Sequence, residues 1–500
     1  MANSPEALSL YAVLALLLRW GVSLHSYSGK GKPPMFGDYE AQRHWMEITY
    51  HLPVKEWYQN STNNDLLYWG LDYPPLSAYH SLICGVFAQW VNPEFIALFK
   101  SRGYESYSHK FFMRVSVILA DILVFIPAVF WWCSEARRRA NPSKTRSGFP
   151  LVLLVLAYPG LILIDHGHFQ YNSVSIGFMI AAIAAIMGNC NIIGAILFTL
   201  AVNYKQMELY HALPFFFYLL GTCLQQKSYT RKFYELAKIG SAVLLTFSII
   251  WLPLAVNDAA KHTLIRLFPF NRGPYEDKVA NFWCSASVLY KFHRAWGNVG
   301  MARACLAATA IAVLPSCVDL VMRPEVKRLH LALVNSSLAF FLFSYHVHEK
   351  SILLVALPVA LIASQDWWMQ PALVLPHLWF LCITTLSMFP LLTRDGLTIP
   401  AVCLTILYPL LCLLVASGFE SPPKNSPFRV LMQSNILVRY AAVMSLTIFV
   451  ILIWAYLTIK PPEIYPDLFP LLISAFSCAH FIPFFVYFNW IQFTLPSEKV

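Results

Sequence analysis

Long apolar stretches, separated by short polar segments, recur along the chain from residue 7 to residue 490. A helix needs about 20 mostly apolar residues to cross the roughly 30 Å of hydrocarbon in a membrane, and these stretches approach that length. The pattern predicts an all-helical, polytopic membrane protein with about fourteen spans in one domain, residues 1–500. The expected spans are residues 7–25, 112–133, 149–164, 172–188, 190–203, 209–224, 238–256, 301–322, 329–344, 351–364, 370–389, 397–416, 435–458 and 468–490.

The composition agrees with a lipid environment. Hydrophobic residues make up 58% of the chain and charged residues only 12%, whereas soluble domains carry roughly 25% charged residues. The net charge of +10 comes from short basic clusters between apolar stretches rather than from one face of a soluble helix. Membrane topology therefore explains the charge, and no nucleic acid partner is expected.

The basic clusters also predict the orientation of the spans. They lie at residues 137–146, 227–238, 323–328 and 424–429, each after an even-numbered span. Because positive residues next to spans stay on the cytosolic side, both termini are expected in the cytosol. The loops after odd-numbered spans are then expected on the opposite, luminal side.

Two of these luminal loops are long, residues 26–110 and residues 257–300. Residues 75–91 of the first loop are apolar, but counting them as a span would invert every later loop, so we expect a helix lying in the membrane interface. The sequon at Asn60 falls in the same loop, where a glycosylation site must be, whereas a second sequon, at Asn335, lies inside a span.

The first long loop opens with an acidic motif, residues 36–45 (FGDYEAQRHW), just after the first span. Apolar positions in and after this motif follow helical spacing, which places Asp38 at the start of a helix near the membrane surface. Gly37 permits a sharp turn before it. Asp38 is therefore a candidate catalytic carboxylate; the alternative is a helix N-cap, and the two roles are compatible.

A second motif in the same loop, residues 68–75 (YWGLDYPP), surrounds Asp72 with aromatic side chains and two prolines. A rigid, extended segment with flat faces can bind a sugar. The alternative is a turn that precedes the interfacial helix.

Three further polar clusters end apolar stretches or fill the second long loop. They are residues 165–172 (DHGHFQYN), 267–278 (LFPFNRGPYEDK) and 345–350 (YHVHEK). Polar groups at membrane depth are costly unless they line a site, which makes the first cluster a candidate site. For the other two a solvated loop is the alternative.

The His-x-His pairs in two of these clusters invite a zinc site, since imidazoles are common zinc ligands. Neither segment has an HExxH pattern or a nearby cysteine, and no Asp-x-Asp pair calls for a metal on a nucleotide sugar. Cations at the membrane surface have a simpler use, which is to hold a lipid phosphate. Arg272, His348 and Lys350 are candidates for that contact, and no metal or other cofactor is expected.

The motifs FGDYEAQRHW, YWGLDYPPL, DHGHFQYN, LFPFNRGPYEDKVANFWC and YHVHEKSI resemble those of the membrane glucosyltransferases of N-glycan precursor assembly. The motifs run from residue 36 to residue 352, and the rest of the chain matches mainly in its pattern of spans. Residues 38–45 and 69–73 are similar to the enzymes that add the first glucose to the nine-mannose oligosaccharide. The sister enzymes, which add the second glucose, are the alternative.

The resemblance implies a GT-C fold, whose long first luminal loop carries the catalytic base, here Asp38. It also implies an inverting reaction that forms an alpha-1,3-linked glucose, with dolichyl phosphate glucose as donor and a dolichyl-diphosphate-linked oligosaccharide as acceptor. The expected location is the endoplasmic reticulum membrane, with the active site facing the lumen, and the expected state is a monomer. We expect the substrates to contact side chains of the motifs, namely Glu40, Arg43, His44, Trp69, Asp72, Tyr73, Asp165, His166, His168, Gln170, Arg272, His346, His348, Glu349 and Lys350.

Two other classes of protein share part of this pattern. A transporter of lipid-linked sugars would have the same spans and basic loops, but the sequence shows no inverted repeat and its polar clusters gather on one side. A purely structural subunit would tolerate substitution of the loop acids, and the density of acids and aromatics there favours an enzyme.

Overall fold

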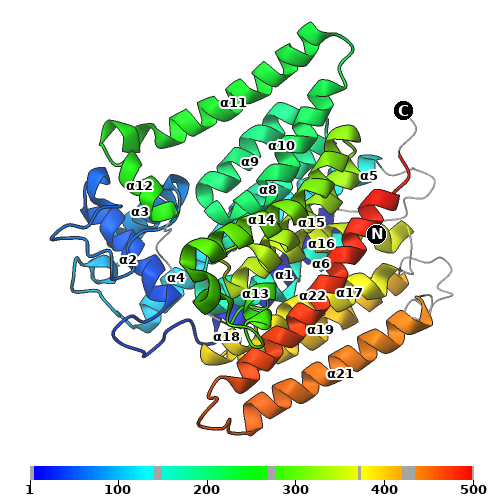
Figure 1. Ribbon diagram of the computed structural model, residues 1–500. Coiled ribbons are helices and arrows are strands. Elements are labelled where there is room, and N and C mark those ends of the chain that lie inside the picture. The colour runs from blue at the N-terminus through cyan, green and yellow to red at the C-terminus, as the bar shows by residue number, and fades with distance from the viewer. Residues whose placement is uncertain (1–4, 140–148, 269–277, 370–372, 419–433, 498–500) are drawn as a thin grey trace.

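The computed structural model describes residues 5–139, 149–268, 278–369, 373–418 and 434–497. Its named elements in these residues are all helices, which confirms the predicted all-helical class. Long helices pack into one bundle, and a group of shorter helices lies together outside it (Figure 1).

The bundle follows the predicted spans closely. Its elements are α1 (Pro5–Ser23), α4 (Tyr107–Ala120), η3 (Asp121–Phe125), α5 (Ile126–Arg139), α6 (Phe149–Leu156), α7 (Pro159–Ile162), η4 (Leu163–Phe169), α8 (Asn172–Met187), α9 (Asn191–Tyr204), α10 (Leu209–Leu224), α11 (Tyr229–Val256), α14 (Phe292–Met322), α15 (Val326–Phe343), α16 (Leu353–Met369), α17 (Val374–Ser387), α18 (Phe389–Arg394), α19 (Thr398–Gly418), α21 (Ile436–Thr458) and α22 (Leu468–Thr494). Each predicted span overlaps one or more of these helices, although residues 149–164 run over α6, α7 and the start of η4, and residues 370–372 lie outside the described residues. Within the described residues, eight helical stretches are long and apolar enough to cross a membrane and five apolar helices are shorter, so the count of fourteen spans stays a prediction.

The exposure of apolar side chains differs between the centre and the periphery of the bundle. Every residue of α8 except Phe178 is buried, so this helix can be apolar on all sides, as a helix at the centre of a bundle must be. At the periphery, α11 and α21 expose large apolar side chains such as Leu244 and Val443 (Figure 1). An apolar outer surface of this kind suits contact with lipid rather than water.

The first long loop forms the group of helices outside the bundle. It contains α2 (Asp38–His51), η1 (Val54–Glu56), α3 (Pro75–Val91) and η2 (Pro93–Ile96). α2 and α3 approach closely at Gly85, where a Cβ atom would lie 2.7 Å from a backbone oxygen of α2. The outer face of α3 exposes Ile83, Phe87 and Trp90 at helical spacing. The helix predicted at 75–91 is thus confirmed, and its position in the membrane interface stays a prediction.

The second long loop meets the first. It contributes α12 (Ala260–Leu267), which lies beside α2 and α3 (Figure 1), and α13 (Phe282–Ala286). Arg266 of α12 donates a hydrogen bond of 3.0 Å to the carbonyl oxygen of Gly70. The α12 part of the second long loop therefore contacts the first long loop.

Candidate active site

Asp38 is presented by a turn that only glycine adopts easily. Gly37 precedes α2 with a φ of 84°, and a Cβ atom at this position would lie 2.6 Å from Oγ of Ser28. The N-cap of α2 is Gly37, and Asp38 is the first helical residue. The predicted N-cap role of Asp38 is therefore wrong, because its carboxylate turns toward other segments instead of the amides of its own helix.

Three segments that are far apart in the sequence meet at the Asp38 carboxylate. Lys350 Nζ lies 2.6 Å from its Oδ2 atom, His168 Nε2 lies 3.1 Å from the same oxygen, and Gln170 Nε2 donates a hydrogen bond of 2.5 Å to it. Within the described part of the chain, all three side-chain contacts fall on Oδ2. Its other oxygen, Oδ1, has no side-chain partner among the described residues, and the side chain of Asp38 remains 24% exposed.

The cationic partners decide the charge of this acid. Burial on its own would raise the pKa of Asp38, but the charges of Lys350 and His168 and their hydrogen bonds hold it well below its usual range. The Asp38 carboxyl is therefore ionised at neutral pH and can accept a proton.

His168 is brought to Asp38 by an irregular helix. The DHGHF part of the motif lies in η4 (Leu163–Phe169), a π-helical stretch that ends at Phe169 with a φ of 93°. Such wide turns are rare and occur mostly at functional sites. The carbonyl of His168 also accepts a 3.0 Å hydrogen bond from the amide of Ser28, which joins η4 to the segment that leads into Asp38.

Two other predicted site residues of this motif face the protein interior. Asp165 accepts hydrogen bonds from Asn172 Nδ2 at 2.6 Å and from the amide of Ser173 at 2.7 Å. His166 contacts Asp121 at 3.0 Å, and Asp121 also pairs with Arg19. Both residues are at most 1% exposed, and these contacts hold η4 in place; their predicted contact with substrate stays a prediction. The two imidazoles of the His-x-His pair thus point to different carboxylates.

Lys205 was not predicted as a site residue, and it extends the cluster. Its Nζ atom donates to Gln170 Oε1 at 3.1 Å and to the side-chain oxygen of Asn172, and it lies 4.9 Å from the centre of the Tyr73 ring. Burial, together with the charge of Lys350, lowers the pKa of Lys205 below its usual range. The sequence held a signal for it, because residue 205 follows the odd-numbered span 190–203 and is therefore predicted on the same side of the membrane as Asp38.

The second loop motif lies against this cluster. Tyr73 contacts Lys205 through its ring, and the backbone carbonyl of Asp72 accepts a 3.0 Å hydrogen bond from Gln206 Nε2. Trp69 has a φ of 48°, and its carbonyl accepts a 2.8 Å hydrogen bond from the indole of Trp45. Tyr73 is therefore next to the site, while the backbone of Asp72 and Trp69 joins the loop to its neighbours.

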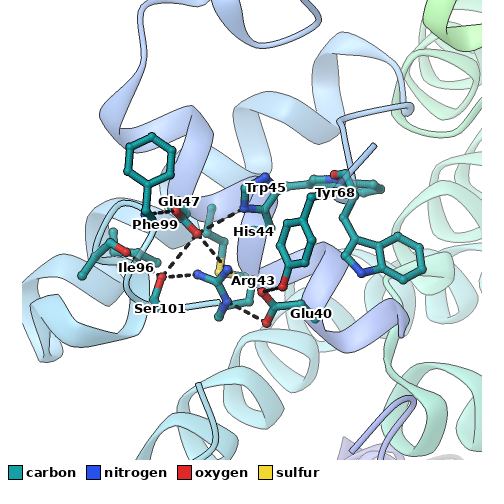
Figure 2. A network of polar contacts seen from close by, with 12 residues as sticks. Glu40, Arg43, His44, Trp45, Glu47, Tyr68, Ile96, Phe99 and Ser101 are labelled. Atoms are coloured by element: carbon teal, nitrogen blue, oxygen red, sulfur yellow. Dashed lines mark hydrogen bonds and ion pairs between the residues drawn. The ribbon is translucent and has the colours of Figure 1, made fainter. Parts of the chain in front are cut away.

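Glu40, Arg43 and His44 form a separate buried network within the first loop (Figure 2). Arg43 makes two hydrogen bonds to Glu40, of 2.6 and 2.8 Å, and lies 2.7 Å from Glu47, which also contacts His44 at 3.1 Å. Tyr68 completes the network through a 2.7 Å hydrogen bond to Glu40. Arg43 is 0% exposed, and these contacts tie α2 to the rest of the loop; the predicted substrate contacts of these three residues stay predictions.

The YHVHEK motif contributes its last residues to the site. Lys350 contacts Asp38 as described, and Glu349 lies 3.6 Å from Arg394. His348 is the N-cap residue of η6 (Glu349–Ile352), and the carbonyl of His346 accepts a 3.5 Å hydrogen bond from the hydroxyl of Tyr210. The predicted phosphate contacts of His348 and Lys350 stay predictions, and Arg272 lies outside the described residues.

Comparisons with known proteins point to one family. The ALG6, ALG8 glycosyltransferase family matches residues 14–487. The chain is 45% identical over 497 residues to the dolichyl pyrophosphate Man9GlcNAc2 alpha-1,3-glucosyltransferase of Gallus gallus, covering 97% of this chain and 96% of that protein. It is 48% identical over 484 residues to the probable enzyme of the same name in Drosophila melanogaster, covering 97% and 98%, and 43% identical over 499 residues to that of Arabidopsis thaliana, covering 97% and 90%.

The buried network gives a testable expectation about stability. Arg43→Gln removes the positive charge that both buried carboxylates, Glu40 and Glu47, contact, so we expect it to lower the free energy of unfolding by about 3–5 kcal/mol. Arg138→Gln removes an ion pair with the same spacing, Glu135–Arg138, whose arginine side chain is 72% exposed, and it should cost less than about 1 kcal/mol. Unfolding of both purified variants in detergent measures the difference. Equal losses would contradict the structural role of Arg43.

Proposed function

Because the chain belongs to the ALG6, ALG8 glycosyltransferase family, we propose that it transfers glucose from dolichyl phosphate glucose to the dolichyl-diphosphate-linked Man9GlcNAc2 oligosaccharide. The observation that carries this proposal is the ionised Asp38 carboxylate, held through one oxygen among cationic side chains. The names of the relatives specify the nine-mannose acceptor, which favours addition of the first glucose over addition of the second.

The proposed reaction is a single displacement at the anomeric carbon. A hydroxyl of the terminal mannose attacks this carbon, the bond to the phosphate oxygen breaks, and dolichyl phosphate leaves with the bonding electrons. Oδ1 of Asp38 receives the proton of the hydroxyl as the new bond forms. Because attack comes from the face opposite the leaving group, one carboxylate suffices and the configuration inverts. A phosphate leaving group needs no protonation, so no second acid is required.

Lys350 connects the base with the leaving group. Its ammonium group contacts Asp38 at 2.6 Å, and a donor phosphate bound beside it would share this charge. Charge that develops on the phosphate is stabilised strongly where water is scarce. As Lys350 shifts toward the phosphate, Asp38 loses part of its ion pair and becomes a stronger base at the moment when the mannose proton must leave. His348 and Lys205 are further cations of the proposed site.

We also propose that this site faces the lumen of the endoplasmic reticulum and that both termini are cytosolic. Basic residues follow the even-numbered spans, and the segments that meet at Asp38 all follow odd-numbered ones. A transporter would be expected to place its polar residues near the middle of the bilayer, whereas these residues lie at the ends of helices. Glucosyl transfer by purified protein in detergent, without a sealed compartment, distinguishes the enzyme from a transporter.

Asp38→Asn tests the proposed base directly. The amide cannot accept the mannose proton, so we expect kcat for glucose transfer to fall about 10²- to 10⁴-fold while the protein remains folded. Asp65→Asn is the matched control, because it changes an exposed acid of the same loop whose carboxylate accepts a hydrogen bond from the amide of Leu67. Transfer at the normal rate by Asp38→Asn would remove Asp38 as the base.

The pH dependence of transfer should reveal the effect of Lys350 on the pKa of Asp38. In the wild type the lowered pKa of Asp38 keeps the base ionised, so the acid limb of kcat/KM lies below about pH 4, the ordinary value for aspartate. Lys350→Gln removes a neighbouring positive charge, so the carboxylate takes up its proton at a higher pH and the acid limb moves upward. KM for the donor should rise in the same variant. An acid limb that stays in place would mean that Lys350 does not act on the base.

Glycosylation at Asn60 tests the orientation. Asn60 is exposed in the first loop, so the protein made in cells should carry a glycan that an endoglycosidase removes, and Asn60→Gln should abolish this mobility shift. Asn335, in the second sequon, is 0% exposed within α15, and Asn335→Gln should leave the shift unchanged. A wild-type protein without glycan would speak against a luminal first loop.

A further inference from the structure

The segment between α18 and α19 reaches the candidate active site from the last third of the chain. Asp395 lies in this turn, and its Oδ2 atom is 2.5 Å from Nδ1 of His168. The side chains of both residues are nearly inaccessible, at 6% and 2% exposed. His168 therefore lies between two carboxylates, with Asp395 on one ring nitrogen and Asp38 on the other.

The turn is built to approach η4 closely. Gly396 follows Asp395 with a φ of 74°, and a Cβ atom there would lie 3.3 Å from the side chain of Ser26. On the opposite side, a Cβ atom at Gly167 would lie 2.8 Å from the side chain of Leu397. Lys32 also donates a 2.8 Å hydrogen bond to the carbonyl of Arg394. Backbone and side chains together thus hold Asp395 against His168.

The chemistry of the groups determines where the protons are. A carboxylate oxygen accepts hydrogen bonds, so Nδ1 of His168 donates its N–H group to Asp395, and Nε2 does the same toward Asp38. Nζ of Lys350 also lies 3.2 Å from Nε2; with Nε2 protonated, these two nitrogens do not bond to each other but share Oδ2 of Asp38. His168 is then an imidazolium whose ring orientation is defined at both ends. With Lys350, the cluster holds two positive and two negative charges in contact.

We propose that Asp395 is a positioning residue for the transfer reaction, acting through His168. By accepting the Nδ1 hydrogen bond it fixes the imidazole ring so that its Nε2–H group holds Oδ2 of Asp38. This contact leaves Oδ1 of Asp38 directed to the acceptor. The inference rests on the proposed function of Asp38 and adds a residue from a part of the chain outside the recognised motifs.

A double-mutant cycle separates this role from a purely structural one. Asp395→Asn is made in the wild type and in His168→Gln, and kcat and KM are measured with dolichyl phosphate glucose and the lipid-linked nine-mannose oligosaccharide. In the wild type we expect kcat to fall on the order of tenfold to a hundredfold, with KM for the donor nearly unchanged, because the asparagine no longer compensates the imidazolium. In His168→Gln the same change should have less than about a twofold effect, since the residue through which it acts is gone. Asp395→Glu, which restores the charge, should recover part of the rate.

Asp467→Asn provides the matched control. Asp467 forms an exposed ion pair with Lys278 in a different turn, and its substitution should leave kcat unchanged. Equal fold-losses from Asp395→Asn in both backgrounds, or a normal rate in the wild-type background, would overturn the inference. If His168→Gln is too slow to measure, kcat, KM and the unfolding midpoint of Asp395→Asn in the wild-type background decide. An unchanged kcat overturns the inference, and so does a loss of kcat that is explained by a lowered unfolding midpoint.

The same assay distinguishes failure of the proposed function from failure of the inference about Asp395. If the wild-type protein transfers no glucose to the nine-mannose acceptor, the proposed function fails, whatever Asp395 does. If the wild type transfers glucose and Asp395→Asn behaves like Asp467→Asn, only the inference about Asp395 fails.

Discussion

The contact of Asp38 with Lys350, His168 and Gln170 joins parts of the chain that are more than a hundred residues apart. An acid that stands alone next to a membrane tends to be neutral, because burial disfavours its charge. The neighbouring cations reverse this tendency and keep the carboxylate ionised. They can do so only if η4, η6 and the start of α2 keep their positions relative to one another. The remaining structure can be understood as the means of holding these three segments together.

Several buried polar networks supply this support. Arg19 and Asp121 hold His166 in the middle of η4, and Arg114 donates a 2.8 Å hydrogen bond to the carbonyl of Gly167 in the same element. In the first loop, Arg43 takes the central place between two glutamates. Removing one partner of a buried ion pair is expensive, so each network favours a single arrangement. These networks therefore fix the positions of the protein side chains around Asp38.

Much of this arrangement could be predicted from the sequence. Hydrophobic patterning located a helix at each proposed span and at residues 75–91, and the polar clusters identified Asp38, His168, Gln170 and Lys350, which the structure brings together. The pattern could not distinguish motif residues that face a substrate from those that brace the loop, such as Arg43 and His166, since both kinds are polar residues in the same short segments. Asp395 follows the odd-numbered span 370–389, so the predicted topology put it on the same side as Asp38, but a single acid in a turn gives no sign of its contact with a histidine from another helix.

The proposed reaction requires that Oδ1 of Asp38 receives the acceptor proton while Lys350 contacts the phosphate. A structure with an unreactive donor analogue and the nine-mannose acceptor tests it most directly. We expect Oδ1 of Asp38 to lie within hydrogen-bond distance, about 2.6–3.2 Å, of the attacking mannose hydroxyl, with Lys350 in contact with the phosphate. A complex in which both substrates are bound and this carboxylate points away from the hydroxyl would contradict it.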